Sequence, residues 1–168
     1  PVVIGTTGWL EKIEEVNLLC NHYNSPVFYA SNFSIGMNIT FAINEKLAKW
    51  MNQFNDYDVK IDETHHVHKL DSPSGTAISL AEGIISNLDR KSGWVLGDNH
   101  SANKLQIYDH RIGEVPGTHI VEYKSNIDKI ELKHEAFNRQ GFALGAVKVA
   151  EWIPNKQGLL SMKNFLEL

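Results

Sequence analysis

The spacing of apolar residues changes from helical to strand-like and back along the chain, and this change restricts the fold more than any other feature. Apolar residues recur at three- and four-residue steps over about 36–55 and again over 142–153. Between 105 and 136 they alternate with polar residues, as in half-buried strands, and short connections favour antiparallel pairing of consecutive strands. The middle of the chain is therefore predicted to be α+β, a mixed, largely antiparallel sheet with helices on one face.

Two helices and one strand are expected ahead of the alternating region. A strand is predicted over 58–63 and a helix over about 73–88. The segment between them, which contains a cluster of histidines, is then the connection from strand to helix. The longer helix, over about 36–55, is expected to have an apolar face formed by Ile39, Ile43, Leu47, Trp50, Met51 and Phe54.

The two ends of the chain have the pattern of a parallel α/β domain. A short apolar strand at 2–4 runs into a Gly-Thr-Thr-Gly turn, a helix and a second apolar strand that starts near Pro26. Strand, turn, helix and strand in this order predict a parallel sheet, whose ligands bind at the carboxyl ends of the strands. Two strands do not form a stable sheet alone. The opening is therefore interpreted as the tail of a larger domain, and residues 33–138 as a separate α+β domain.

Composition narrows the classes of partner and compartment. With 16 basic and 20 acidic residues the net charge is −4, which argues against nucleic acid as the main partner. The single cysteine, Cys20, excludes an intramolecular disulfide and fits a reducing compartment. No apolar run approaches the roughly 18 residues of a membrane span, and no export leader is recognised. A cytoplasmic protein without membrane contact is predicted.

Residues 62–77 gather His65, His66, His68, Lys69 and Asp71 directly before a predicted helix start. A metal site is one interpretation, because neutral imidazole is a common ligand. Neighbouring residues of an extended chain face opposite ways, however, and no cysteine pair or HExxH pattern completes a ligand set. We predict no metal. Histidines in surface or satisfied core positions are the structural alternative.

Acid–base chemistry on a small anion is the third interpretation of this stretch. A histidine transfers a proton near neutral pH, and Lys69 adds a fixed positive charge. Ser72 or Ser74 is expected to cap the helix, with Pro73 in its first turn. The free N–H groups there, with Thr76, would hold a carboxylate. Together these groups predict a pocket for a carboxylated substrate.

Residues 63–77, Glu-Thr-His-His-Val-His-Lys-Leu-Asp-Ser-Pro-Ser-Gly-Thr-Ala, closely resemble the signature of the dihydrodipicolinate reductase (4-hydroxy-tetrahydrodipicolinate reductase) family. Residues 5–9, residues 30–36, and Arg139 before "FALGAV" resemble further segments of that family in the same order. The resemblance implies NADH- or NADPH-dependent reduction of a cyclic unsaturated imine dicarboxylate to tetrahydrodipicolinate, on the route to diaminopimelate and lysine.

The resemblance also implies roles for individual residues. His65 would be the general acid, and Lys69 a second proton donor and carboxylate contact. His68 has no implied role and is expected to face solvent. The substrate-binding residues implied are His66, Ser74, Gly75 and Thr76. The cofactor-binding residues implied, around the nicotinamide, are Gly5, Thr6, Thr7, Ala30, Ser31, Asn32, Phe33 and Arg139.

The same resemblance implies the domain organisation. Residues 1–32 and 139–168 would belong to a Rossmann-like dinucleotide-binding domain, and 33–138 to a substrate-binding domain that forms a homotetramer through its sheet. The family's Gly-rich pyrophosphate loop would precede Pro1, so this stretch is expected to be inactive by itself. The alternative is a non-catalytic module that oligomerises or binds a dicarboxylate. A lyase or hydrolase acting on a keto acid is a third possibility, because His and Lys also serve those reactions.

Overall fold

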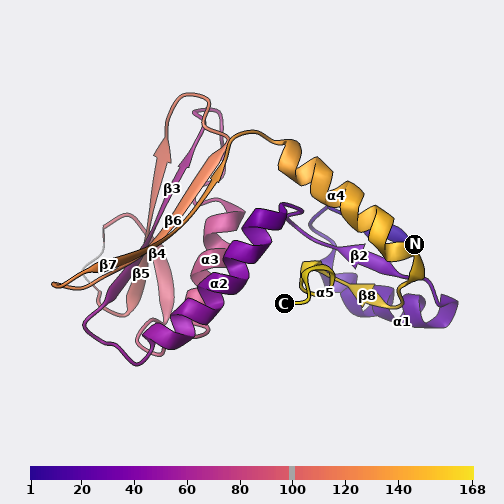
Figure 1. Cartoon of the computed structure of the whole chain (residues 1–168), viewed down its shortest axis with the longest axis horizontal. Coiled ribbons are helices and arrows are strands. Elements are labelled where there is room, and N and C mark those ends of the chain that lie inside the picture. Colours follow the sequence, from indigo (N-terminus) through magenta and orange to yellow (C-terminus); the bar gives the residue numbers. More distant parts are fainter. Residues whose placement is uncertain (99–100) are drawn as a thin grey trace. The chain divides into compact units, whose positions relative to one another are not determined.

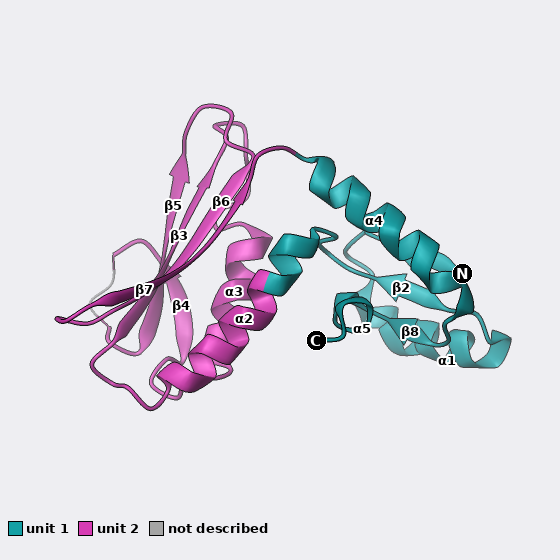
Figure 2. Ribbon diagram, viewed as in Figure 1, with its two compact units in different colours: residues 1–39, 139–168 teal, residues 40–138 magenta. Residues whose placement is uncertain are grey.

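The computed structural model of this chain describes residues 1–98 and 101–168. The chain forms two compact units, drawn in teal and magenta in Figure 2. The first unit joins residues 1–39 with 139–168, and the second contains residues 40–138. Figure 1 labels the helices and strands along the chain.

The first unit is built on a small parallel sheet, which confirms the prediction from the strand–turn–helix–strand pattern. Strand β2 lies between β1 and β8 and runs parallel to both. Parallel neighbours need a long crossover, and helix α1 supplies it between β1 and β2. The elements are β1 (Val2–Ile4), a 3-10 turn (Leu10–Lys12), α1 (Ile13–Tyr23), β2 (Val27–Tyr29), α4 (Gln140–Trp152), a second 3-10 turn (Ile153–Asn155), β8 (Leu159–Leu160) and α5 (Met162–Leu166).

Both chain segments of the first unit contribute to one core. Helix α4 approaches the loop after β2 closely, since a Cβ at Gly145 would lie 1.9 Å from the carbonyl oxygen of Phe33. Any side chain at position 145 would push α4 away from this loop. The buried side chains of this core are Phe28, Ala30, Phe33, Val149, Ile153 and Met162.

The second unit contains a five-stranded mixed sheet in the order β4-β5-β3-β6-β7. Strand β3 is central, parallel to β5 and antiparallel to β6. At the two edges, β4 runs parallel to β5 and β7 runs antiparallel to β6. The strands are β3 (Asp58–His65), β4 (Gly93–Leu96), β5 (Lys104–Arg111), β6 (Gly117–Lys124) and β7 (Lys129–Ala136), and the helices are α2 (Ile35–Met51), which begins in the first unit, and α3 (Gly75–Ile85).

The mixed sheet with helices agrees with the predicted fold class, but the predicted pairing of consecutive strands is wrong for β5 and β6. In the described sheet β3 lies between them, and the two pairings that involve β5 are both parallel. Val59 and Ile61 of β3 are almost completely buried, which suits a central strand and not an edge. Strand β4 was not predicted, because its four half-exposed residues carry too short a pattern.

Helices α2 and α3 lie side by side against one face of this sheet (Figure 1). The helix predicted over about 36–55 is confirmed as α2, although much of its apolar stripe is exposed: Ile43 is 47% and Trp50 56% exposed, whereas Asn44 is buried. The amide nitrogen of Asn44 donates a 2.9 Å hydrogen bond to the carbonyl of Leu80 in α3. The contact between α2 and α3 is therefore made by the small polar side chain of Asn44. Large apolar side chains of α2, such as Ile43 and Trp50, face outward. No helix in the described residues is long and apolar enough to cross a membrane.

Candidate active site

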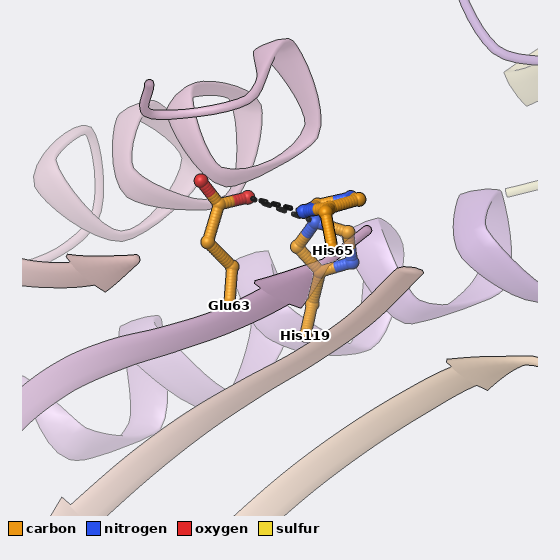
Figure 3. Close-up of side chains that lie close together, drawn as sticks. All are labelled: Glu63, His65 and His119. Atoms are coloured by element: carbon orange, nitrogen blue, oxygen red, sulfur yellow. Dashed lines mark ion pairs between the residues drawn. The ribbon is translucent and has the colours of Figure 1, made fainter. Parts of the chain in front are cut away.

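The inward-facing row of strand β3 changes from apolar to ionisable toward its carboxyl end. Alternate residues of a strand share one face, so Val59 and Ile61 are followed on that face by Glu63 and His65, all of them buried. Strand β6 runs the opposite way and places His119 directly beside Glu63 in the register. Figure 3 shows the three ionisable side chains turned toward one another.

Glu63 is a fully buried carboxylate, with 0% of its surface exposed. The backbone amide of Ser74 donates to its Oε1 at 2.8 Å, and the Ser74 hydroxyl donates to its Oε2. Burial by itself raises the pKa of Glu63, but hydrogen bonds from His119 and Ser74 and the charge of His119 outweigh it and lower the pKa to about 2. Glu63 is therefore an ionised group inside the second unit.

His65 and His119 share one oxygen of this carboxylate. His65 Nδ1 and His119 Nε2 each lie 3.4 Å from Glu63 Oε2. The two imidazole rings pack edge to face, with their centroids 5.0 Å apart. Burial, followed by the charge of His119, lowers the pKa of His65 to about 4, although Glu63 acts in the opposite direction. The charges of Lys69 and Arg111 lower it further. The His65 imidazolium is thus a stronger acid than that of an ordinary histidine, and its protonation depends on nearby negative charge.

Glu63, His65 and His119 also offer three ligand atoms within 4.8 Å of one another, the spacing of a metal site. This set differs from the one weighed in the sequence, where only the adjacent histidines were considered. The hydroxyl of Ser74 bonds to the shared oxygen of Glu63 and lies 3.2 Å from His119 Nε2. Because two of these groups already have this partner, we interpret Glu63, Ser74 and His119 as a hydrogen-bonded network. Among the described residues, the buried Nδ1 of His65 faces the Glu63 carboxylate at ion-pair distance but makes no hydrogen bond.

Ser74, and not Ser72, caps helix α3. Its side-chain oxygen accepts from the amide of Ala77 at 3.1 Å, whereas the Ser72 hydroxyl donates to Asp109 at 2.7 Å. We predicted a substrate contact for Ser74, but the structure turns its hydroxyl and its amide toward Glu63 and leaves only 3% of the residue exposed. Ser74 therefore connects the helix to the buried carboxylate.

The next two residues present the open mouth of α3. The first amides of a helix have no acceptor within the helix, and among the described residues no other acceptor is seen for those of Gly75 and Thr76. No atom lies within 4 Å of the place where a Cβ of Gly75 would stand. This arrangement fits a small anion, as predicted for these two residues.

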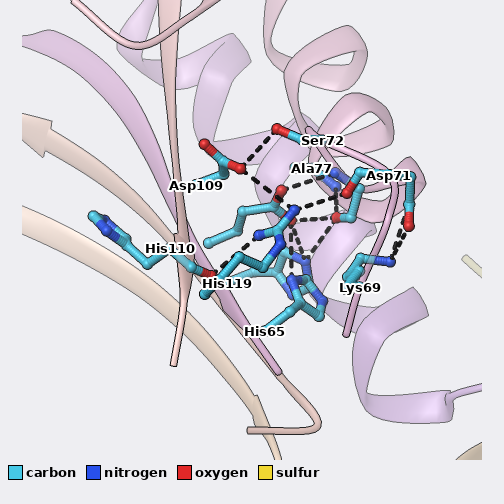
Figure 4. Close-up of polar contacts among 11 residues, drawn as sticks. His65, Lys69, Asp71, Ser72, Ala77, Asp109, His110 and His119 are labelled. Carbon is cyan, nitrogen blue, oxygen red and sulfur yellow. Dashed lines mark hydrogen bonds and ion pairs between the residues drawn. The ribbon is translucent and has the colours of Figure 1, made fainter. Parts of the chain in front are cut away.

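Lys69 and Asp71, shortly before α3, lie together in Figure 4. Lys69 Nζ bonds to both carboxylate oxygens of Asp71, at 2.8 and 3.0 Å, and this contact lowers the pKa of Asp71. Arg111 donates to the carbonyl of Asp71 at 2.7 Å and lies 3.3 Å from the Asp109 carboxylate. In the described residues no hydrogen bond joins Lys69 to His65. A substrate carboxylate that reaches Lys69 has to compete with Asp71.

The two remaining histidines of the cluster differ in exposure. His66 is half-buried, with its ring 6.1 Å from that of His68. The side chain of His68 is 72% exposed, and its Nε2 lies 3.3 Å from Oε1 of Glu114, which is also exposed. The prediction that His68 faces solvent is confirmed.

In the first unit, the predicted nicotinamide residues follow two neighbouring parallel strands. Residues 5–7 come directly after β1 and residues 30–33 directly after β2, so both loops lie at the carboxyl edge of the sheet. The backbone amide of Ala30 donates a 3.2 Å hydrogen bond to the carbonyl oxygen of Ile4. A Cβ at Gly5 would lie 3.3 Å from the ring of Phe33, so the two loops are close. Residues 5–7 are exposed, whereas Phe33 is largely buried. Contact of these loops with a nicotinamide stays a prediction.

Of two further residues of the predicted cofactor set, Asn32 has a structural role and Arg139 is exposed. The Asn32 side chain accepts from the amide of Ser34 at 2.9 Å, which makes it a cap before α2. Arg139 precedes α4 and is exposed. Their contact with a cofactor stays a prediction.

A surface hollow of about 440 Å³ opens at the other end of β3, between Asp58 and Glu122. It is lined by charged side chains of both signs, among them the exposed carboxylate of Asp56. The buried ionisable groups lie at the opposite end of the same strand. We therefore place the candidate site at the carboxyl end of β3.

Comparison with known proteins identifies the family. The family described as "Dihydrodipicolinate reductase, C-terminus" matches residues 36–166. The 4-hydroxy-tetrahydrodipicolinate reductase of Christiangramia forsetii is 49% identical over 166 residues, which cover 99% of this chain and 69% of that protein. The chain belongs to the dihydrodipicolinate reductase family.

Other members of the dihydrodipicolinate reductase family agree. The enzyme of the same name from Akkermansia muciniphila is 36% identical over 100% of this chain and 70% of its own length. The one from Methanocorpusculum labreanum is 36% identical, and this chain spans 66% of it. A solved structure, the dipicolinate-bound dihydrodipicolinate reductase from Paenisporosarcina sp. TG-14, has a TM-score of 0.79 at 24% identity, over 98% of this chain and 63% of that one. That likeness supports the fold.

Three residues that lie beside His65 were not singled out in the sequence: Glu63, His119 and Arg111. Glu63 was part of the recognised signature, but no role was assigned to it. The missed signal is the alternation itself, since Glu63 and His119 occupy inward positions of their strands, where apolar residues are the rule. Arg111 lies opposite His65 in the parallel register of β3 and β5, which local sequence does not reveal.

Proposed function

We propose that the full-length protein reduces a cyclic unsaturated imine dicarboxylate to tetrahydrodipicolinate with NADH or NADPH, in the synthesis of diaminopimelate and lysine. Family membership supports the reaction class. The observation that carries the assignment to this chain is the convergence of buried His65, cationic Lys69 and the open amides of α3 at one end of β3.

The second unit holds the dicarboxylate in this proposal. The amides of Gly75 and Thr76 accept one carboxylate, because a helix N-terminus is a favourable site for an anion. Lys69, released from Asp71, contacts a carboxylate as well, and half-buried His66 borders the ring. The substrate therefore brings two negative charges next to His65.

His65 then supplies the proton. Its pKa of about 4 in the free protein rises when the dianion binds, because negative charge favours the imidazolium. The nicotinamide, when bound, supplies a hydride to one ring carbon. His65 protonates the neighbouring carbon that becomes electron-rich, a contribution worth about 10²–10⁴ in rate for a positioned acid. Lys69 keeps its role as a carboxylate contact and second proton donor.

The first unit holds the nicotinamide in the same proposal. The residues involved are those after β1 and β2, Gly5 to Thr7 and Ala30 to Phe33, with Arg139 at the start of α4. The exposed residues after β1 border the flat group, and the buried ring of Phe33 supports the loop at Gly5. Comparison of the turnover rates with NADH and with NADPH distinguishes the two cofactors.

Kinetics on the full-length protein test the proposal. Oxidation of reduced nicotinamide, followed by absorbance, is expected only when the cyclic dicarboxylate is supplied. Replacing His65→Gln and Lys69→Met together is expected to lower turnover by at least about 10³-fold while the circular dichroism spectrum is unchanged. Turnover within tenfold of the unsubstituted protein would contradict the assignment of both residues.

We further propose a cytoplasmic homotetramer that assembles through the sheet of the second unit. Strand β7 is an edge strand, and Ile130 on it and Ile127 in the preceding turn are exposed. Exposed edges of this kind pair with other chains. Light scattering at micromolar concentration is expected to give four times the monomer mass, and a strict monomer would contradict this assembly.

A further inference from the structure

We propose that Glu63 is a positioning residue which, with His119, fixes the orientation of His65 and keeps a proton on its Nδ1 during catalysis. This inference rests on the proposed function, because it assigns further residues to the same proton transfer. The geometry that carries it is a fully buried carboxylate oxygen 3.4 Å from His65 Nδ1 and 3.4 Å from His119 Nε2.

The carboxylate of Glu63 is held on two sides. Glu63 and His65 lie on the same face of central strand β3, so the backbone fixes their separation. Ser74 bonds to both carboxylate oxygens from the N-terminus of α3, through its amide and its hydroxyl. Rotation of the carboxylate would break these bonds in a buried place, where unpaired polar groups are costly.

His119 supports the carboxylate from the opposite strand. It stands directly beside Glu63 in the antiparallel register and has only 5% of its surface exposed. Its Nε2 faces Glu63 and the Ser74 hydroxyl, and its ring meets that of His65 edge to face. His119 therefore fills the space into which the His65 ring would otherwise turn.

An anion that faces Nδ1 favours the proton on that nitrogen and leaves Nε2 for the substrate. Nε2 of His65 lies beside Gly117, where a Cβ would approach it to 3.1 Å. Glu63 itself remains ionised, with a pKa lowered to about 2, so it orients the imidazole and does not donate a proton. The same logic holds where a buried carboxylate fixes the tautomer of a catalytic histidine.

The proton transfer balances with these groups. The hydride that adds to one carbon of the conjugated imine moves an electron pair onto the adjacent ring carbon. The Nε2–H bond of the His65 imidazolium breaks, its electrons stay on Nε2, and the proton forms the new C–H bond. His65 is left neutral with its proton on Nδ1, still facing the Glu63 carboxylate.

Glu63→Gln in the full-length protein tests the proposal, because it keeps the shape and removes the charge. We expect kcat to fall about 100-fold or more while KM for the dicarboxylate changes less than about threefold. The alkaline limb of the profile of kcat against pH, which reports the substrate-bound enzyme, is expected to move to lower pH by at least about one unit, since the group that favours the imidazolium is gone. Asp62→Asn is the matched control, a neighbouring carboxylate on the other face of β3 that pairs with Lys60 at 2.8 Å, and unchanged kinetics are expected there. Glu63→Gln with kcat within threefold and an unmoved pH profile would overturn the proposal.

Nitrogen NMR of the unsubstituted full-length protein tests it without any substitution. With pyridine-2,6-dicarboxylate bound, His65 is expected to carry a proton on Nδ1 at every pH from 5 to 9. A neutral His65 with a bare Nδ1 and a protonated Nε2 would overturn the positioning role. Absence of reductase turnover in the unsubstituted protein would instead refute the proposed function, so the two failures are distinguishable.

Discussion

Strands β3 and β6 pair along a buried face whose two ends have the same backbone geometry but different side chains, apolar at one end and ionisable at the other. At one end Val59 and Ile61 face Val121 and Tyr123 in an apolar core. At the other end, two residues further along β3, Glu63 and His65 are equally buried. Buried charges lower stability unless they are paired. The comparison shows that the strand places ionisable groups in a rigid, desolvated position, and that the adjoining core holds them there.

The apolar end is expected to show the largest single effect on stability. Ile61→Ala leaves a cavity in a completely buried position and should lower the free energy of unfolding by about 2–5 kcal/mol, at neutral and acidic pH alike. Urea unfolding followed by circular dichroism measures this. Leu18→Ala, at an exposed position of α1, is the control and should cost less than about 1 kcal/mol. A similar small loss at Ile61 would contradict the assignment of this end as the core.

The ionisable end is expected to lose stability in acid in two steps. The pKa of His65 is lowered from 6.5 to about 4, so the unfolded chain binds a proton that the folded protein does not as the pH falls through this window. The pKa of Glu63 is lowered from 4.5 to about 2, so its stabilisation is complete above pH 4.5 and is lost as the pH falls toward 2. Each step is on the order of a few kcal/mol.

Urea unfolding at a series of pH values measures these steps. His65→Gln should remove the upper step, between pH 6.5 and 4, and leave the lower one. An unchanged upper step in that variant would show that another group titrates there.

The smallest expected effect concerns the exposed pair beside the site. Asp71→Asn removes the competitor for Lys69, so pyridine-2,6-dicarboxylate should bind about three- to tenfold more tightly, while stability changes by less than about 1 kcal/mol. Asp56→Asn, an exposed carboxylate at the far end of β3, changes net charge equally and is the control. Calorimetry on both variants measures the difference. Equal affinities would show that Lys69 does not reach the ligand.

The sequence predicts this molecule best where the signal is local. The alternation over 58–63 and the helical spacing over about 73–88 predicted β3 and α3, which run over 58–65 and 75–85, and the motif between them located the histidines and Lys69. The partners of these residues come from other strands. His119 meets Glu63 only through the β3–β6 register, between residues far apart in the chain, and consecutive pairing of strands gave the wrong neighbour for β5.

Packing between α2 and α3 explains why the buried face of α2 could not be predicted. Periodicity gave α2 an apolar stripe, but it did not show which stripe meets α3, because the contact depends on Asn44 and on the space at Gly83 of the partner helix. The Lys69–Asp71 pair lies within the motif, yet the sequence alone did not show that the ammonium would be bound to its neighbour.

Proton uptake on binding of pyridine-2,6-dicarboxylate tests most directly whether His65, Lys69 and the mouth of α3 form one dianion site. Titration calorimetry of the full-length protein, in buffers of different ionisation enthalpy, measures it. We predict uptake of a fraction of a proton that grows as the pH falls from 7 to 5 and disappears in His65→Gln, because the bound dianion raises the pKa of His65 from about 4. Tight binding without proton uptake, or uptake that persists in His65→Gln, would contradict the account.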